Sequence, residues 1–350
     1  SRAELLAEPQ AIWLDELLGR SPAEALTQLI THRIEKLSIG ARRILRAAAI
    51  LGDEPRQREI LEFGSAYDDL AAFMELENQN ILIRQTQGTI AFPHPQIRQV
   101  ALEAMAKRQV SRLHKQAASV IAASPDSAER QEELGRHLLN AGLHHEAYSV
   151  LRKAAERASF DGRLTSAVDC LEQALVAADS LADKYPTIRA EVSRELGEVL
   201  IQLGAVRRAE DILRNASMEA RSANDAVLSA ELLRLHGKAA VLLGNPKKGR
   251  DEIQATLNFA MKRGDIEVAV RASVDLIEAL DKSGDKERIA ETLGQSVMLI
   301  EKLEPEKLLT TRIQIFNRLG RFELERGNNS KAIATFAQAL DLAEQCEDRY

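Results

Sequence analysis

The sequence has few aromatic residues and few cysteines. Of its 350 residues, 4% are Phe, Trp or Tyr, although 45% are hydrophobic. A core with so little aromatic bulk must be built from Ala, Leu, Ile and Val, which suits closely packed helices better than a β-sandwich. Cys170 and Cys346 lie far apart in the sequence and make no disulfide framework. A reducing, cytoplasmic location is therefore expected.

Long apolar runs and a strong charge bias are also lacking. No apolar stretch approaches the ~18 residues that span a bilayer, so no membrane segment is expected. The 47 basic and 53 acidic side chains give a formal charge of −6, which argues against a general nucleic-acid binder. The sequence begins abruptly with SRAELLAEPQ, and we expect it to be a piece of a longer protein.

The first 120 residues are irregular. Ser21 and Pro22 are typical of a helix start, and Ser38 and Gly52 are expected to bound a second helix. A third helix is expected from Tyr67 to Asn80, with an apolar set of Leu70, Phe73, Met74 and Leu76.

The apolar period then changes from helical to alternating. Residues 81–83 and 89–92 are expected to pair as a short hairpin closed by Gly88, and helical spacing resumes after Pro95. The order helix, helix, helix, hairpin, helix predicts a winged-helix module within residues 1–120.

From about residue 128 the sequence repeats itself. A small residue is followed seven positions later by a glycine, then after five by a small residue, then after four by a large apolar one. The four slots hold Gly135, Gly142, Ala147 and Leu151; Gly197, Gly204, Ala209 and Leu213; Gly237, Gly244, Gly249 and Ile253; Gly320, Gly327, Ala332 and Phe336. A fifth copy fits with Ile277, Gly284, Ile289 and Leu293.

These slots predict a helix–turn–helix repeat. The first small residue allows two helices to approach, the second glycine ends the first helix in a left-handed conformation, and the large residue fills the space between the helices. The first helices are expected to begin near Pro186, Asp225, Asp265 and Pro305. We therefore predict an all-α chain, with residues 121–350 forming an α-α superhelix.

The segments LGRHLLNAGLHHEAYSVLRKAAERA and LGRFELERGNNSKAIATFAQAL resemble the tetratricopeptide repeat. This resemblance covers roughly residues 128–350. The middle copies are ~40 residues long instead of 34, and His236 and Ile277 depart from the pattern, so a variable superhelix is expected.

The segments THRIEKLSIGARRILRAAAILG, ILIRQTQGTIAFPHPQIRQVALEAM and RLHKQAASVIA resemble the winged-helix region of bacterial STAND-type signalling ATPases. Relatives include regulators of the maltose-regulon-activator type and kinases or cyclases with the same regulatory block. The resemblance implies an ATPase module upstream of Ser1 that binds ATP or ADP. This chain has no G-x-x-x-x-G-K-[ST] motif, and no cofactor is expected in it.

His94 stands at the position where the resemblance implies contact with the diphosphate of ADP in the full-length protein. Phe92-Pro93-His94 keeps the Phe and the His of the family motif. An imidazole suits this role because it donates a hydrogen bond to phosphate and gains charge near neutral pH. The alternative is a histidine at a helix N-terminus satisfied by the local backbone.

The concave face of the superhelix is the predicted binding surface. Basic side chains in successive repeats are expected to clamp carboxylates of a peptide, a partner protein or a small inducer. The alternative is a solvated face with i,i+4 ion pairs such as Arg194–Glu198. The predicted set is Glu191, Arg194, Glu198, Glu231, Arg234, Lys238, Arg271, Glu278, Asn317 and Arg321.

Other site types find little support. The 67–80 helix carries four carboxylates and no basic residue, and residues 1–120 hold 15 basic and 15 acidic side chains, so direct DNA binding is not expected. His137, His144 and His145 lack a nearby Cys and are expected to be solvated turn residues, without a metal. The protein is not expected to be an enzyme, since no HExxH or GxSxG motif is present.

The sequence thus predicts the regulatory sensor and protein-interaction region of a multidomain signalling ATPase. The repeats are expected to bind an effector or partner, and the winged helix is expected to couple this binding to the absent nucleotide module. The alternative is a passive tetratricopeptide scaffold that assembles a complex without switching.

Overall fold

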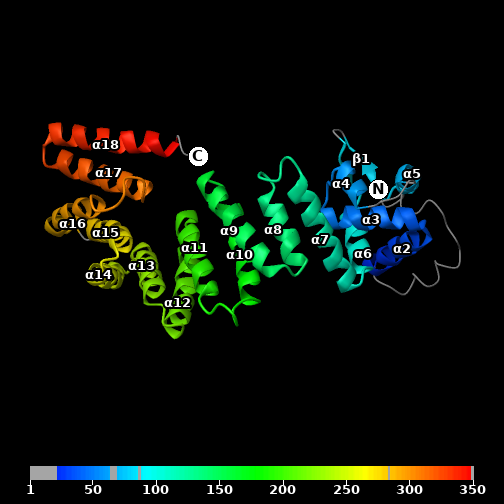
Figure 1. Cartoon of the computed structure of the whole chain (residues 1–350), viewed down its shortest axis with the longest axis horizontal. Coiled ribbons are helices and arrows are strands. Elements are labelled where there is room, and N and C mark those ends of the chain that lie inside the picture. The colour runs from blue at the N-terminus through cyan, green and yellow to red at the C-terminus, as the bar shows by residue number, and fades with distance from the viewer. Residues whose placement is uncertain (1–21, 64–68, 86–87, 283, 348–350) are drawn as a thin grey trace. The chain divides into compact units, whose positions relative to one another are not determined.

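The computed structural model (Figure 1) describes residues 22–63, 69–85, 88–282 and 284–347. The chain divides into two compact units, Ser1–Val150 and Leu151–Tyr350. We call them unit 1 and unit 2. The predicted domains, 1–120 and 121–350, divide the chain earlier than the compact units do. No helix within the described residues is long and apolar enough to cross a membrane.

Unit 1 contains helices around a main apolar core, a smaller apolar cluster of Ala118, Ile121 and Leu134, and a short hairpin. The elements are α2 (Pro22–Lys36), α3 (Ile39–Leu51), α4 (Gln57–Glu62), α5 (Asp69–Asn78), β1 (Ile83–Arg84), β2 (Ile90–Ala91), α6 (Pro95–Glu103), α7 (Lys107–Ala123) and α8 (Gln131–Asn140). Helix α9 (His144–Phe160) contains the boundary between the units. The core gathers large apolar side chains, of which Leu45, Ile50 and Phe73 are almost completely buried.

Several predicted boundaries in unit 1 are confirmed. The Ser38 hydroxyl accepts a hydrogen bond from the Ala41 N–H at 3.1 Å, which caps α3. Gly52 ends that helix and donates its N–H to the Ala48 carbonyl. Strands β1 and β2 pair antiparallel as predicted, and Gly88 between them has φ +78°.

The third predicted helix needs two corrections. An additional helix, α4, precedes it; the α4 N-cap residue, Arg56, makes no side-chain cap, so no sequence signal marks this start. On α5, Phe73 and Leu76 are buried as expected, whereas Leu70 and Met74 are 66% and 53% exposed. Ser21 and Tyr67, the predicted starts of two helices, lie outside the described residues.

A buried ion pair links α4 to the start of α8. Glu59 is 3% exposed, and its two carboxylate oxygens accept hydrogen bonds from the Arg130 guanidinium at 2.6 and 3.2 Å. Arg130 also donates to Glu133 at 2.8 and 3.0 Å. Such a forked contact fixes both position and orientation of the two helices.

Unit 2 is a row of helical hairpins. Its helices are α10 (Leu164–Asp179), α11 (Ile188–Leu203), α12 (Val206–Ser222), α13 (Ala226–Leu242), α14 (Pro246–Arg263), α15 (Ile266–Asp281), α16 (Lys286–Ile300), α17 (Leu309–Glu325) and α18 (Asn329–Glu347). Each helix packs on the next, and α11, α13, α15 and α17 also contact one another in sequence (Figure 1). These four form the inner layer of unit 2, while α12, α14, α16 and α18 form the outer layer.

The repeat slots have the predicted roles. A Cβ added at Gly197 would lie 2.5 Å from Leu213 Cδ2, and one at Gly320 would lie 2.7 Å from Phe336 Cε1. Only glycine therefore allows these large side chains to fill the space between paired helices. The turn glycines all have left-handed φ values between +72° and +89°: Gly142, Gly204, Gly244, Gly284 and Gly327.

Two of the four predicted helix starts are caps. The carboxylates of Asp225 and Asp265 accept hydrogen bonds from the third N–H beyond them, at 2.9 and 3.2 Å. Helix α11 starts at Ile188, two residues after Pro186. The start near Pro305 is wrong, because a turn follows it and α17 begins at Leu309.

Candidate functional site

A polar groove crosses the inner layer of unit 2. Its walls are α11, α13 and α15, and its end is formed by the segment that leads into α17 and by the first two turns of α17, so four successive inner helices contribute side chains. The groove has a volume of about 620 Å³. The lining residues are Arg194, Glu198, Ile201, Gln202, Arg234, Leu235, Lys238, Arg271, Val274, Asp275, Glu306, Leu308, Leu309, Thr310, Thr311 and Gln314.

The structure brings together most of the predicted surface. Five predicted residues line the groove directly, and two more, Glu231 and Glu278, form ion pairs with them. The five are Arg194, Glu198, Arg234, Lys238 and Arg271.

The remaining three predicted residues lie elsewhere. Glu191 accepts a hydrogen bond from the Thr187 hydroxyl at 2.9 Å near the start of α11. Asn317 is exposed on α17 and Arg321 faces a separate depression next to Phe322, so neither is among the described residues that line the groove. The repeat pattern places them at slots equivalent to those of Arg234 and Lys238, but on α17 the lining of the groove extends only as far as Gln314.

The floor of the groove is a buried charge cluster. Arg234, 4% exposed, donates to Glu231 at 2.9 Å and to Asp275. Asp275, also 4% exposed, accepts a further contact from the Lys238 ammonium at 3.0 Å. Burial disfavours the charged carboxylate, but Arg234 and Lys238 outweigh it and hold the pKa of Asp275 below its usual range. Arg234 is thus a buried structural residue of the groove. The alternative expectation, a solvated charged face, does not describe it.

The rim carries more exposed pairs. Arg271 lies 3.5 Å from Glu231, and Arg194 lies 3.8 Å from Glu198 on the same helix. Glu278 is shared between Lys238 at 4.0 Å and Arg318 at 3.6 Å. The pairs of Glu198 with Arg194 and of Glu278 with Lys238 and Arg318 are partly exposed and contribute at most about 1 kcal/mol each, so a ligand can exchange them at small cost.

The charges of the groove are nearly balanced. Four basic and three acidic side chains line it, and Glu231 and Glu278 pair with the basic ones from behind. Exposed Gln202, Thr310 and Gln314 add hydrogen-bond donors and acceptors. This arrangement favours a polar segment that carries charges of both signs over a ligand that is only anionic.

Asp275 and the segment before α17 were missed by the sequence-based prediction. Asp275 occupies a slot that holds Leu235 one repeat earlier, so a carboxylate where an apolar residue is expected was the available signal. The segment is held by Arg312, whose guanidinium donates to the carbonyls of Ile300, Leu303, Glu304 and Lys307 at 2.7–3.0 Å. Leu308 in this segment has φ +54°, a conformation rarely adopted by a leucine.

His94 lies at the N-cap position of α6 in unit 1. The side chain is half-buried and makes no capping hydrogen bond, while its backbone carbonyl accepts from the Ile97 N–H at 3.0 Å. Phe92 packs against the unit 1 core and anchors the preceding strand. The imidazole therefore caps no backbone N–H at the start of α6.

The three histidines considered for a metal do not share one environment. His137 is 2% exposed, so its prediction as a solvated turn residue is wrong; its Nδ1 lies 2.9 Å from Nδ1 of His114 on α7. His145 is exposed at the start of α9. Within the described ranges, no group of three or more His, Cys, Asp or Glu side chains is arranged to hold a metal ion.

The fold is similar to that of solved helical-repeat proteins. One is a Signal Transduction ATPase with Numerous Domains (STAND) protein with a tetratricopeptide repeat sensor, from Pyrococcus horikoshii; the match covers 96% of this chain at 13% identity, with a TM-score of 0.54. This chain spans only 49% of that protein. No protein-family model matches the sequence, and the search of curated proteins found no match.

A second solved structure is the Rap conjugation gene regulator of the plasmid pLS20 in complex with the Phr* peptide. It matches 89% of this chain and 77% of its own, at 12% identity and a TM-score of 0.53. At these identities the likeness establishes the fold alone. The predicted all-α fold with tetratricopeptide-like repeats is confirmed.

Proposed function

We propose that unit 2 is a regulatory repeat region that binds an extended peptide or a partner-protein segment in the inner groove. The observation that carries this proposal is the groove itself, in which side chains from four successive inner helices converge on one polar channel of about 620 Å³. The structural likeness to a regulator solved with a bound peptide supports it. The proposed role is binding and not catalysis. The proposed location is the cytoplasm.

The buried cluster beneath the groove gives the proposal its mechanism. Arg234 and Asp275 fix the relative positions of α13 and α15, because each of these charges is stable in the interior only while paired. Lys238, Arg271 and Glu198 above them keep part of their surface exposed. The buried pairs therefore preorganise the walls, and the rim side chains contact the ligand.

A finer proposal follows from the resemblance to STAND-type ATPases. Unit 1 would include the winged-helix module. An ATPase module that is not part of this chain would bind ATP or ADP. His94, whose imidazole caps no backbone N–H at the start of α6, would then contact the diphosphate of ADP in the resting state. An effector bound in the groove would favour the arrangement in which His94 no longer contacts ADP. It must bind this arrangement more tightly than the resting one, because otherwise it would not shift the equilibrium between them.

The His94 proposal is tested in the full-length protein. His94→Ala is expected to raise basal output and to speed the loss of bound ADP. Unchanged ADP retention together with unchanged output would remove His94 from the mechanism and leave the groove proposal intact.

The alternative function is a passive scaffold that binds partners without switching. It is distinguished by measuring peptide affinity in the intact protein with ADP and with a non-hydrolysable ATP analogue. A sensor requires at least a several-fold difference between the two nucleotides, because coupling between sites is reciprocal. Equal affinities would favour the scaffold.

The groove proposal is tested by selecting binders from a displayed random dodecapeptide library. We expect enrichment on the wild-type chain of peptides with both basic and acidic residues. Thr310→Trp, at an exposed lining position, should abolish their binding by filling the groove. Gln295→Trp, at an exposed position on the outer helix α16, is the matched control and should bind normally. No enrichment, or equal binding by the Thr310→Trp variant, would contradict the proposal.

A further inference from the structure

The outer side of unit 2 has a second cavity, separate from the groove. It has a volume of about 390 Å³ and lies where the end of α12, the start of α13 and the middle of α14 meet. Helices α12 and α14 make few or no close contacts with each other, in contrast to the inner helices α11, α13 and α15. The cavity therefore opens between two outer helices, with α13 as its floor.

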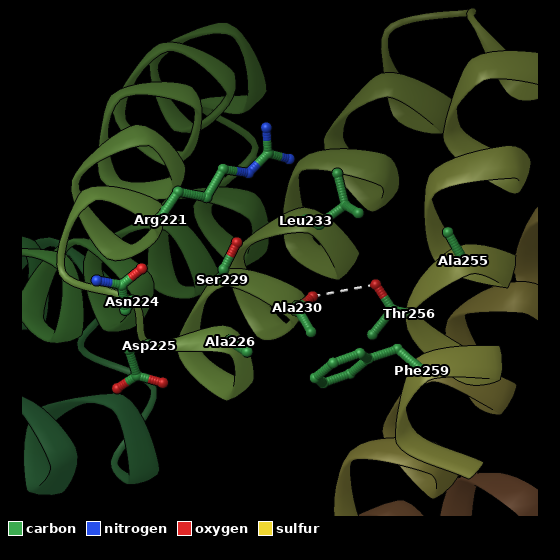
Figure 2. Close-up of a pocket in the computed structure, with 10 residues that line it drawn as sticks. All are labelled: Arg221, Asn224, Asp225, Ala226, Ser229, Ala230, Leu233, Ala255, Thr256 and Phe259. Carbon is green, nitrogen blue, oxygen red and sulfur yellow. Dashed lines mark hydrogen bonds between the residues drawn. The ribbon is translucent and has the colours of Figure 1, made fainter. Parts of the chain in front are cut away.

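The cavity combines an apolar floor with one cation among its lining residues, Arg221; a second, Arg263, lies over the Phe259 ring, with its guanidinium carbon 5.5 Å from the ring centroid. Figure 2 shows Arg221 and Phe259 entering from opposite sides, with Ser229, Ala230 and Leu233 of α13 between them. The dashed line in Figure 2 is the Thr256 hydroxyl donating to the Ala230 carbonyl at 3.0 Å, so this hydroxyl is already used. Apolar contact is what the floor offers to a ligand.

Arg221 is the charged group left available at this cavity. It is exposed and makes no ion pair within the described part of the chain, unlike Arg189, Arg208 and Arg214 of the same unit, which all contact carboxylates. The nearest acidic lining residue, Asp225, is engaged in capping α13 through the Leu228 N–H. A free guanidinium beside an apolar cavity is complementary to a ligand carboxylate next to an apolar group.

Comparison with the following repeat shows that this cavity is a local feature. Asp225 and Asp265 are equivalent caps 40 residues apart. At that spacing, Ala226 and Ala230 correspond to Ile266 and Val270, and Arg221 corresponds to Met261. Val270 is completely buried. The next repeat thus places larger apolar side chains at the positions where the two alanines leave space, and a methionine at the position of Arg221.

The structure assigns to this cavity a second binding site, for a protein or peptide segment that places a bulky apolar side chain beside an acidic residue. The apolar side chain occupies the space above Ala226, Ala230 and Leu233, and the carboxylate pairs with Arg221. A macromolecular segment is the fitting occupant because the cavity is shallow: Arg221, Asn224, Ala226 and Ala255 are all exposed, whereas small-molecule pockets enclose most of their ligand.

The test is a methyl-NMR titration of the whole chain with two blocked dipeptides, acetyl-Leu-Glu-amide and acetyl-Leu-Gln-amide. We expect saturable shifts of the Ala226, Ala230, Leu233 and Thr256 methyl groups. The Glu peptide should bind about threefold more tightly, which is the size of an exposed charge pair. Absence of saturable shifts at these methyl groups would overturn the proposal.

Two variants copied from the next repeat sharpen the test. Ala226→Ile should abolish binding of both peptides by filling the cavity. Arg221→Met should preserve binding but remove the difference between Glu and Gln. A difference that survives in Arg221→Met would overturn the role of Arg221, and normal binding by a folded Ala226→Ile would overturn the site.

The inner-groove variant Thr310→Trp separates this proposal from the one above. It should leave the dipeptide shifts unchanged, since Thr310 lines only the groove among the described cavities. Loss of the shifts in this variant would show that the dipeptides bind in the groove, and would contradict a second site.

Discussion

Both units have apolar cores, but they differ in how their helices are held together. The main core of unit 1 gathers side chains such as Leu45, Ile50 and Phe73. Unit 2 has an apolar core of its own, and it adds glycines that allow paired helices to approach, as at Gly197 against Leu213, and charge pairs that join one repeat to the next. The close contacts at small residues recur from repeat to repeat and define how the helices of unit 2 stack. The charges differ between repeats and define what its surface can bind.

The largest expected effect comes from removing the buried cation of unit 2. Arg234→Met should destabilise α13 and α15 by about 3 kcal/mol, since it leaves Glu231 and Asp275 buried with fewer partners. Hydrogen exchange of amides in these helices measures the loss, and amides of α3 in unit 1 should be unaffected.

Arg214→Met is the matched control. Its side chain is 52% exposed and pairs with carboxylates on its own helix, so the change should stay within about 0.5 kcal/mol. Equal effects of the two substitutions would contradict the structural role assigned to the buried cluster.

The next effect concerns the small-residue contacts. A Cβ at Gly249 would lie 2.3 Å from the Gly237 carbonyl oxygen, which is backbone and cannot rotate away. Gly249→Ala should therefore lower the free energy of unfolding by about 1–3 kcal/mol. Urea unfolding followed by circular dichroism measures this change.

Gly294→Ala is the opposite case on the same type of outer helix. Nothing lies within 4 Å of a Cβ added there, so the substitution should stabilise α16 by about 0.5–1 kcal/mol through helix propensity. If both alanines were equally tolerated, close approach would not be the reason for glycine in the repeat.

A further effect contrasts the pH responses of the two units. Burial, together with the electrostatic influence of His137, Arg136 and Arg98, lowers the pKa of His114 to about 4. Because the folded-state pKa is depressed, the contribution of neutral His114 to the free energy of unfolding is fully present above the unfolded pKa of about 6.5. It is lost as the pH falls from there to about 4. With solvent screening of the half-buried ring, the loss should be about 1–2 kcal/mol in the α7–α8 contact.

The charge cluster of unit 2 should respond only at lower pH. The depressed pKa of Asp275 means that its contribution is lost as pH falls below the unfolded value of about 3.9. Hydrogen exchange should therefore show a lower free energy of local opening at pH 4.5 than at pH 7 in α7 and α8, but not in α13. His114→Gln should remove that difference, and simultaneous weakening of both regions would contradict these assignments.

The fold was largely predictable from the sequence because its signals are local. A glycine with φ near +80° must end a helix, and Asp225 and Asp265 cap the helices that follow them. Helix α4 and the late start of α17 were not predicted, since Arg56 provides no side-chain cap and Leu308 adopts a left-handed conformation that its identity does not indicate.

The site was predictable only in part. Helical spacing placed Arg194, Arg234 and Lys238 on one surface, and they do line one groove. The pairing of Arg234 with Asp275 was not evident because it depends on how α13 and α15 stack, across 41 residues of sequence. Such pairing decides which charges are structural and which remain for a ligand.

The most direct test of the inner groove as the binding site is to map where a selected peptide lies on unit 2. A dodecapeptide enriched on the wild-type chain, carrying one benzoylphenylalanine, is photo-crosslinked and the crosslinked sites are identified by mass spectrometry. We expect crosslinks on the inner helices, at residues near Gln202, Lys238 and Arg271. Crosslinks confined to α12, α14 and α16 would contradict the assignment of the inner groove as the binding site.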